Sequence, residues 1–311
     1  MSNNPLLDFA RKPELTVKLP SNGNWYPEGM INYTLNGEVE VFAMTPKDEL
    51  MMLNPDSLLS GDANIKLIES CVPSVKNAKD LLYPDANTLL LAIHRATYGE
   101  EMIINVTCPK CTEKAIQLED PEKVSEAEKN GEIMIHPQEN KLPIDNLLQS
   151  ISYLDSEYKF NMDNGLTIYF SPTLLKDKLK YGLINFNQQK IAKYYENYDF
   201  EEFATQEDKK EVALKIIEAY ENITDVGNNL ITDSILKIEL PDGSYVDDKQ
   251  MILEFVSKTN TVVIGELHKK IQEINNIGVP SKVSYECQCC GHTWESELAE
   301  FNQSDFFGYS S

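Results

Sequence analysis

The sequence predicts an α+β fold, made of small β elements and a largely helical insertion, on the evidence of three features. Runs of alternating apolar and polar residues, typical of strands, occur towards both ends of the chain. Apolar residues at helical spacing fill most of the middle. Two cysteine clusters, TCPKC at 107–111 and YECQCCGHTW at 285–294, each follow a strand-like run. They lie far apart in sequence, so a shared site would require a long insertion between them.

The composition is that of a globular protein of the cell interior. Of 311 residues, 41% are hydrophobic and 25% are charged. The N-terminus has no apolar run behind a basic start, and no stretch approaches the roughly eighteen uninterrupted apolar residues of a membrane span. We therefore expect a soluble, intracellular chain that does not enter a membrane.

The charge balance excludes one class of partner. Lys and Arg number 28 against 50 Asp and Glu, which gives a formal charge of -22. A chain this acidic repels nucleic acid unless basic residues are concentrated in one patch, and the sequence shows no such patch. We therefore expect no nucleic-acid binding.

We divide the chain into four segments by these patterns. They are a flexible arm (1–16), an N-terminal α/β part with the first cysteine pair (17–119), a mainly helical insertion with a β-hairpin (120–280), and a C-terminal segment with the second cysteine pair and an aromatic tail (281–311).

The N-terminal part begins with a turn and a strand. The stretch VKLPSNGNWYPEG (17–29) indicates a structured turn with aromatic anchors, and EVEVFAM (38–44) alternates as a strand does. Thr45 followed by proline predicts a helix start, and short helices are expected over 46–99, the last of them ended by Gly99.

The first cysteine pair lies in a predicted hairpin. A strand over 101–111 delivers Cys108 and Cys111 at a turn, and KAIQLED (114–120) is expected to be a second strand. Strand, CxxC turn and strand form a zinc knuckle, a turn that presents two cysteines to one metal ion. Residues 120–140 are rich in charge and are expected to be a solvated segment.

The insertion alternates between hairpin and helix patterns. We expect a hairpin over 157–174 that turns at Asp-Asn-Gly, a helical stretch over 174–223 with a break near 198–207, a strand or edge element over 234–248, and a helix, a break and a second helix over 248–278. The chain then returns to strands around the second cysteine cluster.

Together the two cysteine pairs predict a split four-cysteine zinc ribbon. The expected ligands are Cys108, Cys111, Cys287 and Cys290, because each CxxC turn points two sulfurs inward and structural zinc takes four ligands in a tetrahedron. A redox CxxC lacks the thioredoxin-like context here. Gly291 favours Cys287 and Cys290 as the second pair, and Cys289 and His292 stay open as substitute ligands.

The sequence contains none of the common catalytic or nucleotide-binding motifs. HExxH, GxSxG, GxGxxG and nucleotide-binding loops are all missing, and four thiolates would leave zinc no open position for chemistry. Zinc is therefore expected to be structural and the protein non-enzymatic. A zinc-ribbon nucleic-acid-binding protein or transcription-related regulator remains as the alternative, although Lys110, Lys114 and Lys282 near the cysteines are balanced by acidic neighbours.

Several landmarks, in their order along the chain, resemble a known family. They are LPSNGNWYP, TPKDE, LLLAIHRATYGEEMIINVTCPKC, LTIYFSPT, YECQCCGHTW and a terminal DFFG. In this order they resemble the baseplate hub and tail assembly proteins of T-even type contractile-tailed bacteriophages. The doubled cysteine of CQCC departs from a plain CxxC knuckle.

The resemblance implies a phage protein that builds the tail baseplate, either as a component of its central hub or as an assembly factor or chaperone for it. Its partners would be baseplate hub or tail proteins. Its location would be the virion tail baseplate, or the host cytoplasm during assembly. The oligomeric state does not follow from the sequence.

Overall fold

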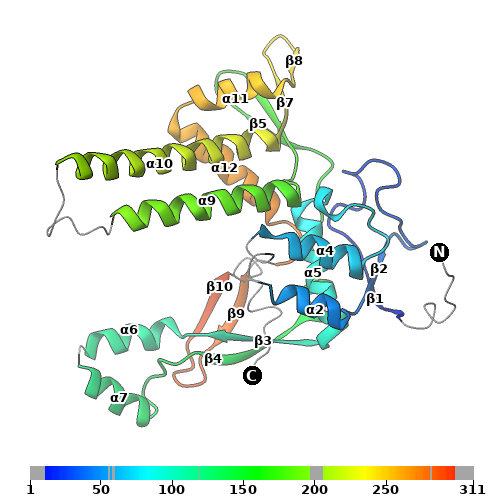
Figure 1. Ribbon diagram of the computed structural model, residues 1–311. Helices are drawn as coiled ribbons and strands as arrows, with labels where there is room; N and C mark the ends of the chain where they lie inside the picture. Colours follow the sequence, from blue (N-terminus) through cyan, green and yellow to red (C-terminus); the bar gives the residue numbers. More distant parts are fainter. Residues whose placement is uncertain are drawn as a thin grey trace.

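Three separate clusters of buried apolar side chains organise the part of the chain that the structure describes. The structure is a computed structural model, and it describes residues 11–54, 57, 60–118, 120–196, 206–280 and 282–297. Figure 1 shows small sheets and helices in a mixed arrangement, so the predicted α+β class is confirmed. The predicted aromatic tail and most of the predicted arm lie outside the described residues.

The first cluster is built around one buried helix. Strands β1 (Pro13–Val17) and β2 (Val39–Phe42) pair antiparallel. Helices α2 (Pro46–Met52) and α4 (Asp62–Cys71), the 3-10 turn η1 (Ala78–Asp80) and helix α5 (Tyr83–Tyr98) follow them. The α5 side chains Leu89, Leu91 and Ile93 are fully buried. Apolar residues on nearly every side of α5 explain its central position.

Local sequence signals set the helix ends in this cluster. Thr45 caps α2, and Asp48 bonds back to the Thr45 backbone in a capping box. Gly99 ends α5 with a φ of 98°, a conformation that favours glycine. One expectation was wrong: residues 13–16 belong to β1 and not to a flexible arm, because they pair with β2.

The predicted turn at 17–29 is held by a buried carboxylate. Asp85 accepts hydrogen bonds from the Ser21 N–H at 2.9 Å and from the Tyr26 hydroxyl at 2.7 Å. The same hydroxyl accepts a bond from the Leu82 N–H at 2.8 Å. Tyr26 therefore acts as the aromatic anchor that the sequence predicts.

The second cluster lies under a four-stranded antiparallel sheet. Its order is β5 (Tyr158–Asn161), β6 (Thr167–Phe170), β7 (Ile235–Glu239) and β8 (Tyr245–Val246). The predicted hairpin is confirmed, with Gly165 at a φ of 86° in its turn. Helices α11 (Lys249–Lys258) and α12 (Thr261–Asn275) supply the rest of this core.

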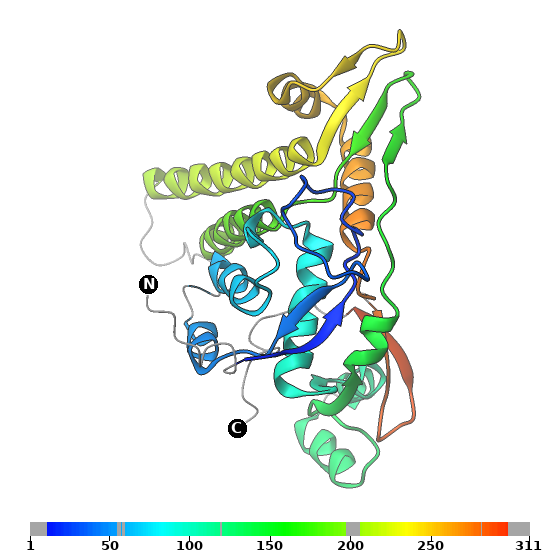
Figure 2. The ribbon, with the colours of Figure 1, turned by 90° about the vertical axis from the view of Figure 1, so that its right-hand side faces the viewer.

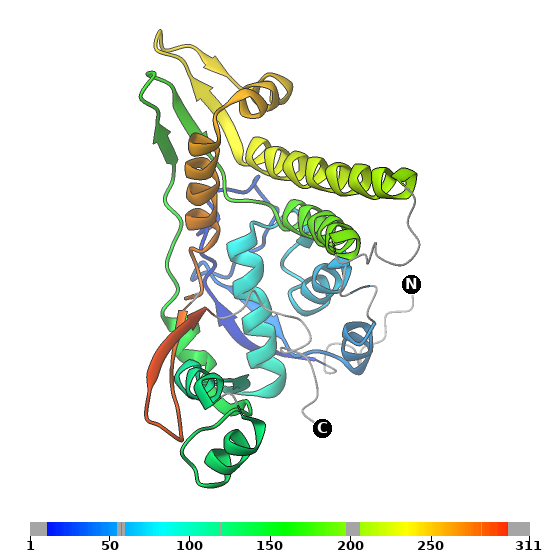
Figure 3. The same ribbon diagram turned by 90° about the vertical axis from the view of Figure 1, so that its left-hand side faces the viewer.

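Between the two strand pairs of this sheet, the chain forms a long antiparallel helix pair. It consists of α9 (Leu175–Glu196) and α10 (Gln206–Ser234), which we call the helical arm. The arm projects sideways from the sheet and the first cluster (Figures 2 and 3). Helix α10 continues to Ser234, well beyond the predicted end near 223, because Ile231 near its end packs into the second core.

The third cluster contains both cysteine pairs. Its elements are β3 (Glu101–Val106), α6 (Pro109–Leu118), α7 (Pro121–Lys129), β4 (Gln138–Pro143), β9 (Lys282–Glu286) and β10 (Thr293–Glu297). Strand β3 pairs with β4, and β9 pairs with β10, both antiparallel. Helix α8 (Ile144–Gln149) leads back to the first cluster, which Ile144 and Leu147 join.

One expectation for this region was wrong, and a second was incomplete. Residues 114–120 do not form a strand, because α6 begins at Pro109 and the apolar positions Cys111, Ala115 and Leu118 share the face that packs on the third core. Most residues of 120–140 are exposed to solvent, as expected, but the segment also contains α7 and the start of β4. The sequence does not indicate strand β4, because few of its side chains are buried and it lacks an apolar pattern. It is a strand because its backbone pairs with β3.

Within the described ranges, no helix combines the length and the apolar content that crossing a membrane would need.

Candidate metal centre

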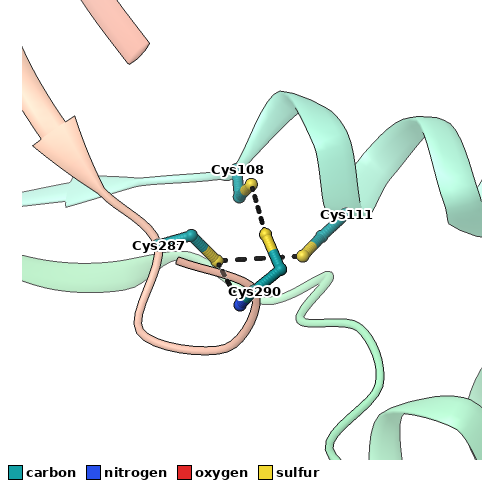
Figure 4. A group of neighbouring side chains, drawn as sticks. All are labelled: Cys108, Cys111, Cys287 and Cys290. Carbon is teal, nitrogen blue, oxygen red and sulfur yellow. Dashed lines mark hydrogen bonds between the residues drawn. The ribbon is translucent and has the colours of Figure 1, made fainter. Parts of the chain in front are cut away.

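Four cysteines from two distant segments meet in the third cluster. The sulfurs of Cys108, Cys111, Cys287 and Cys290 all lie within 4.8 Å of one another. The Cys108 sulfur is 3.7 Å from that of Cys290, and the Cys111 sulfur is 3.8 Å from that of Cys287 (Figure 4). The first three cysteines are buried and Cys290 is partly exposed.

These distances fit a single tetrahedrally bound metal ion. Four sulfurs at about 2.3 Å from zinc in a regular tetrahedron lie roughly 3.8 Å apart. A disulfide would instead bring two sulfurs to about 2.05 Å, and all four cysteines are free thiols. Four soft sulfur donors in this geometry suit zinc or iron and not magnesium or calcium. The residues present therefore fit a metal site.

The first pair lies at the junction of β3 and α6. The Cys108 carbonyl accepts the Thr112 N–H at 3.0 Å, the bond of a first helical turn. Pro109 follows at the first helical position, where its missing N–H costs nothing. Both thiols thus lie at a helix N-terminus, whose positive end favours thiolate. The knuckle is strand to helix, not the predicted strand to strand.

The second pair lies in a tight turn between β9 and β10. The Gly291 N–H donates to the Cys287 carbonyl and the Cys287 N–H donates to the His292 carbonyl, both at 2.9 Å. Gly291 has a φ of 64°, so a glycine suits the position. The Cys290 N–H donates to the Cys287 sulfur at 3.5 Å. The turn thereby directs a backbone N–H at the Cys287 sulfur, and this hydrogen bond stabilises the thiolate form.

Burial and hydrogen bonding act on the four thiols in different directions. Burial raises the pKa of Cys108 and of Cys111. Burial also opposes ionisation of Cys287, but hydrogen bonds from the N–H groups of Cys290 and Cys289, together with those from the thiols of Cys290 and Cys108, lower the pKa of Cys287 to about 7. A metal ion must displace protons from the neutral thiols before it is fully bound, so its affinity will depend on pH.

A buried glutamine holds the second pair against β4. The Gln138 side-chain N–H₂ donates to the Glu286 carbonyl at 2.8 Å, and its carbonyl oxygen accepts the Gln288 N–H at 3.1 Å. Gln138 is among the few buried polar side chains of the molecule. The sequence does not predict this role of Gln138, because a single glutamine in a charged stretch belongs to no recognisable motif.

The two substitute ligands, Cys289 and His292, do not belong to the group of four neighbouring sulfurs. The Cys289 thiol donates to the Gly131 carbonyl at 3.2 Å, and the His292 ring stacks on Trp294 with 6.1 Å between centroids. Cys71 lies in the first core, where Arg11 donates to its sulfur. The structure therefore brings together the four cysteines that the sequence favours.

The shell of apolar side chains around the four sulfurs is small. It contains Ala115, Leu118, Val124, Ala127, Ile133, Met134, Ile135 and Trp294. Four thiolates would complete a tetrahedral shell and leave no position for a substrate or a reactive water. The four cysteines therefore lie close enough to hold one metal ion and, through it, to link two distant chain segments.

A comparison with protein families identifies the chain as a whole. The family model for the T4 bacteriophage base plate protein matches residues 12–308, which is nearly the entire sequence. No curated protein and no solved structure matches the chain. On the strength of that match, the chain belongs to the T4 bacteriophage base plate protein family.

Proposed function

We propose that this protein is a non-enzymatic structural or assembly component of the phage tail baseplate hub, stabilised by one structural zinc ion. The observation that carries the proposal is the family match over residues 12–308. A base plate protein acts through its surfaces, and the closed cysteine centre fits that role because it requires no substrate site. The family description gives no support to a nucleic-acid-binding regulator.

The zinc ion has a clear physical task in this proposal. Cys108 and Cys111 belong to the segment that leads into the insertion, and Cys287 and Cys290 to the segment that leaves it. An apolar cluster as small as the third one seldom holds a fold by itself, and small domains commonly rely on a metal. Zinc bound by all four thiolates would join β3 and α6 to the β9–β10 turn.

The hub role is tested in infected cells. The full-length protein, tagged at one end, is purified from cells infected with its phage, and the co-purified proteins are identified by mass spectrometry. We expect baseplate hub or tail proteins to co-purify. Recovery of DNA or transcription proteins in their place would contradict the proposal.

The location is tested on finished particles. Purified virions and free tails are assayed for the protein by quantitative mass spectrometry. A hub component is expected in both at a fixed ratio to other tail proteins, whereas an assembly factor or chaperone is expected only in the cell extract. A protein that associates with tails at neither stage would contradict both forms of the proposal.

A further inference from the structure

The helical arm has a second apolar surface besides the one that joins its two helices. On α10, which contacts α9, the buried residues Val212 and Ala219 are seven positions apart and so share one side of the helix. Leu214, Ile217 and Tyr220 recur every third residue on another side, where Leu214 is 56% and Ile217 is 53% exposed. A surface helix with apolar residues on two sides is suited to contact two neighbours.

Helix α9 presents the same kind of surface. Phe186 is 52% exposed, and Ile191 and Tyr194 on the same helix are exposed as well. Large exposed apolar side chains are ordinary when scattered, but several on one projecting element indicate an interaction surface.

The charges of the two helices are opposite. Helix α9 carries five lysines and two acidic residues, a net charge of +3. Helix α10 carries three lysines and seven acidic residues, a net charge of -4. The two helices of the arm therefore sum to -1 within a chain of -22. The arm therefore adds little to the net charge repulsion between two copies of the chain.

We propose that the helical arm is a self-association surface, on which the arm of a second copy of this chain packs. In a dimer with a two-fold axis, both copies contribute the same surface patch to the interface. The patch must therefore be complementary to itself in shape and charge. A basic helix beside an acidic helix meets this condition, because α9 of each copy can face α10 of the other. The four helices then form a bundle with the exposed apolar residues inside it.

The arm is large enough for such an interface. Helix α9 has 22 residues, so it is about 33 Å long. Two helices side by side, each about 10 Å wide, give a face of at most roughly 660 Å², or about 1,300 Å² over both copies, when α9 is counted along its full length. Stable interfaces begin at about 1,200 Å². This proposal involves no residue of the metal centre and holds with or without the hub role.

The oligomeric state of the full chain tests the proposal. Light scattering and sedimentation equilibrium up to about 100 μM are expected to show a dimer. The double variant Leu214→Glu and Ile217→Glu is expected to weaken dimerisation at least roughly tenfold. The matched control is Val262→Glu on α12, a 74% exposed apolar site away from the arm, and it is expected to dimerise as the parent does.

Charge variants test the pairing of α9 with α10. Lys190→Glu with Lys193→Glu makes both helices acidic, and Glu218→Lys with Glu221→Lys makes α10 basic. Each double variant alone is expected to be monomeric, and an equimolar mixture of the two is expected to form a one-to-one dimer. Circular dichroism and a melting temperature for each variant check that the arm still folds.

A parent chain that stays monomeric would overturn the proposal, as would a dimer that the Leu214 and Ile217 variant leaves intact. Two charge variants that fail to associate when mixed would overturn the pairing. Capture of a different tail protein on the arm of a monomeric chain would assign the surface to that partner instead.

Discussion

The sulfur of Cys111 in the first turn of α6 lies 3.8 Å from the sulfur of Cys287 at the end of β9. The two residues stand at opposite ends of the segment that contains the insertion. The contact brings together the two ends of a segment that carries most of the second cluster.

Removal of the metal is expected to unfold the third cluster. Its apolar shell is small, and structural zinc supplies about 10–16 kcal/mol of binding free energy in isolated zinc-finger peptides. A strong chelator should lower the melting temperature and reduce the helical signal from α6 and α7. Trp294 packs against this cluster, so its fluorescence should move to longer wavelength.

The chain has two tryptophans, so a Trp25→Phe variant leaves Trp294 as the sole reporter. In that variant the fluorescence change should coincide with metal release, and added zinc should reverse it. Release of the metal with no change in Trp294 emission or in melting temperature would show that the metal does not hold the cluster.

Gln138→Ala is expected to destabilise the β9–β10 turn. The change leaves the Glu286 carbonyl and the Gln288 N–H without the side-chain bonds that hold the turn on β4. Lost bonds of this kind cost about 1–3 kcal/mol each at buried sites. Chemical denaturation and a competition assay for metal affinity provide the measurement.

The control for this variant is Gln149→Ala, because Gln149 is exposed at the end of α8. It should shift stability by less than about 0.5 kcal/mol. Equal effects of the two variants would remove the special role assigned to Gln138.

Asp85 is expected to make stability depend on pH. Burial raises the pKa of Asp85 to about 6, despite hydrogen bonds from Ser21 and Tyr26 that act in the opposite direction. The unfolded value is about 3.9. Because the folded state holds the proton more tightly, this group's contribution to the free energy of unfolding is complete below pH 4 and is lost as pH rises through 6.

The loss amounts to roughly 2 kcal/mol between pH 4 and pH 7. Asp85→Asn cannot ionise, so the difference in unfolding free energy between the parent and this variant should move in the parent's favour as pH falls over that range. Denaturant titrations at several pH values measure it, and a difference that does not vary with pH would contradict the assignment.

Gly61→Ala is expected to destabilise the contact between α4 and the helical arm. Gly61 precedes α4 with a φ of 73°, and a Cβ there would overlap the side chain of Leu179 in α9. Gly37 has nearly the same φ, 74°, with open space around it. Gly37→Ala therefore reports the backbone strain alone.

We expect Gly61→Ala to cost at least about 1 kcal/mol more than Gly37→Ala, measured by chemical denaturation. Similar costs for the two variants would mean that Leu179 moves aside without penalty.

The sequence predicts local features well where they depend on adjacent residues. The Thr45 cap, the Gly99 helix end, the Asp-Asn-Gly hairpin and the CxxC turn with Gly291 are all confirmed, because each depends on the conformational preference of a few neighbouring residues. The four-cysteine cluster was predictable for a different reason. Two CxxC pairs in one chain have few uses other than a shared metal.

The features that were missed depend on contacts between distant residues. Strand β4 is polar and is a strand because its backbone pairs with β3. The CxxC motif at the start of α6 also suits a hairpin, and the contacts of Ala115 and Leu118 with the third core favour the helix. Gln138 acts on a turn at the far end of the sequence, so no local pattern could reveal it.

The central claim is that four particular cysteines bind one zinc ion, and metal content measures it directly. The full chain is purified without chelator, together with Cys290→Ser and its neighbour control Cys289→Ser, and zinc is quantified by mass spectrometry. We predict one zinc per chain in the parent and in Cys289→Ser, and a marked loss in Cys290→Ser. A parent chain without zinc, or a loss confined to Cys289→Ser, would contradict the account.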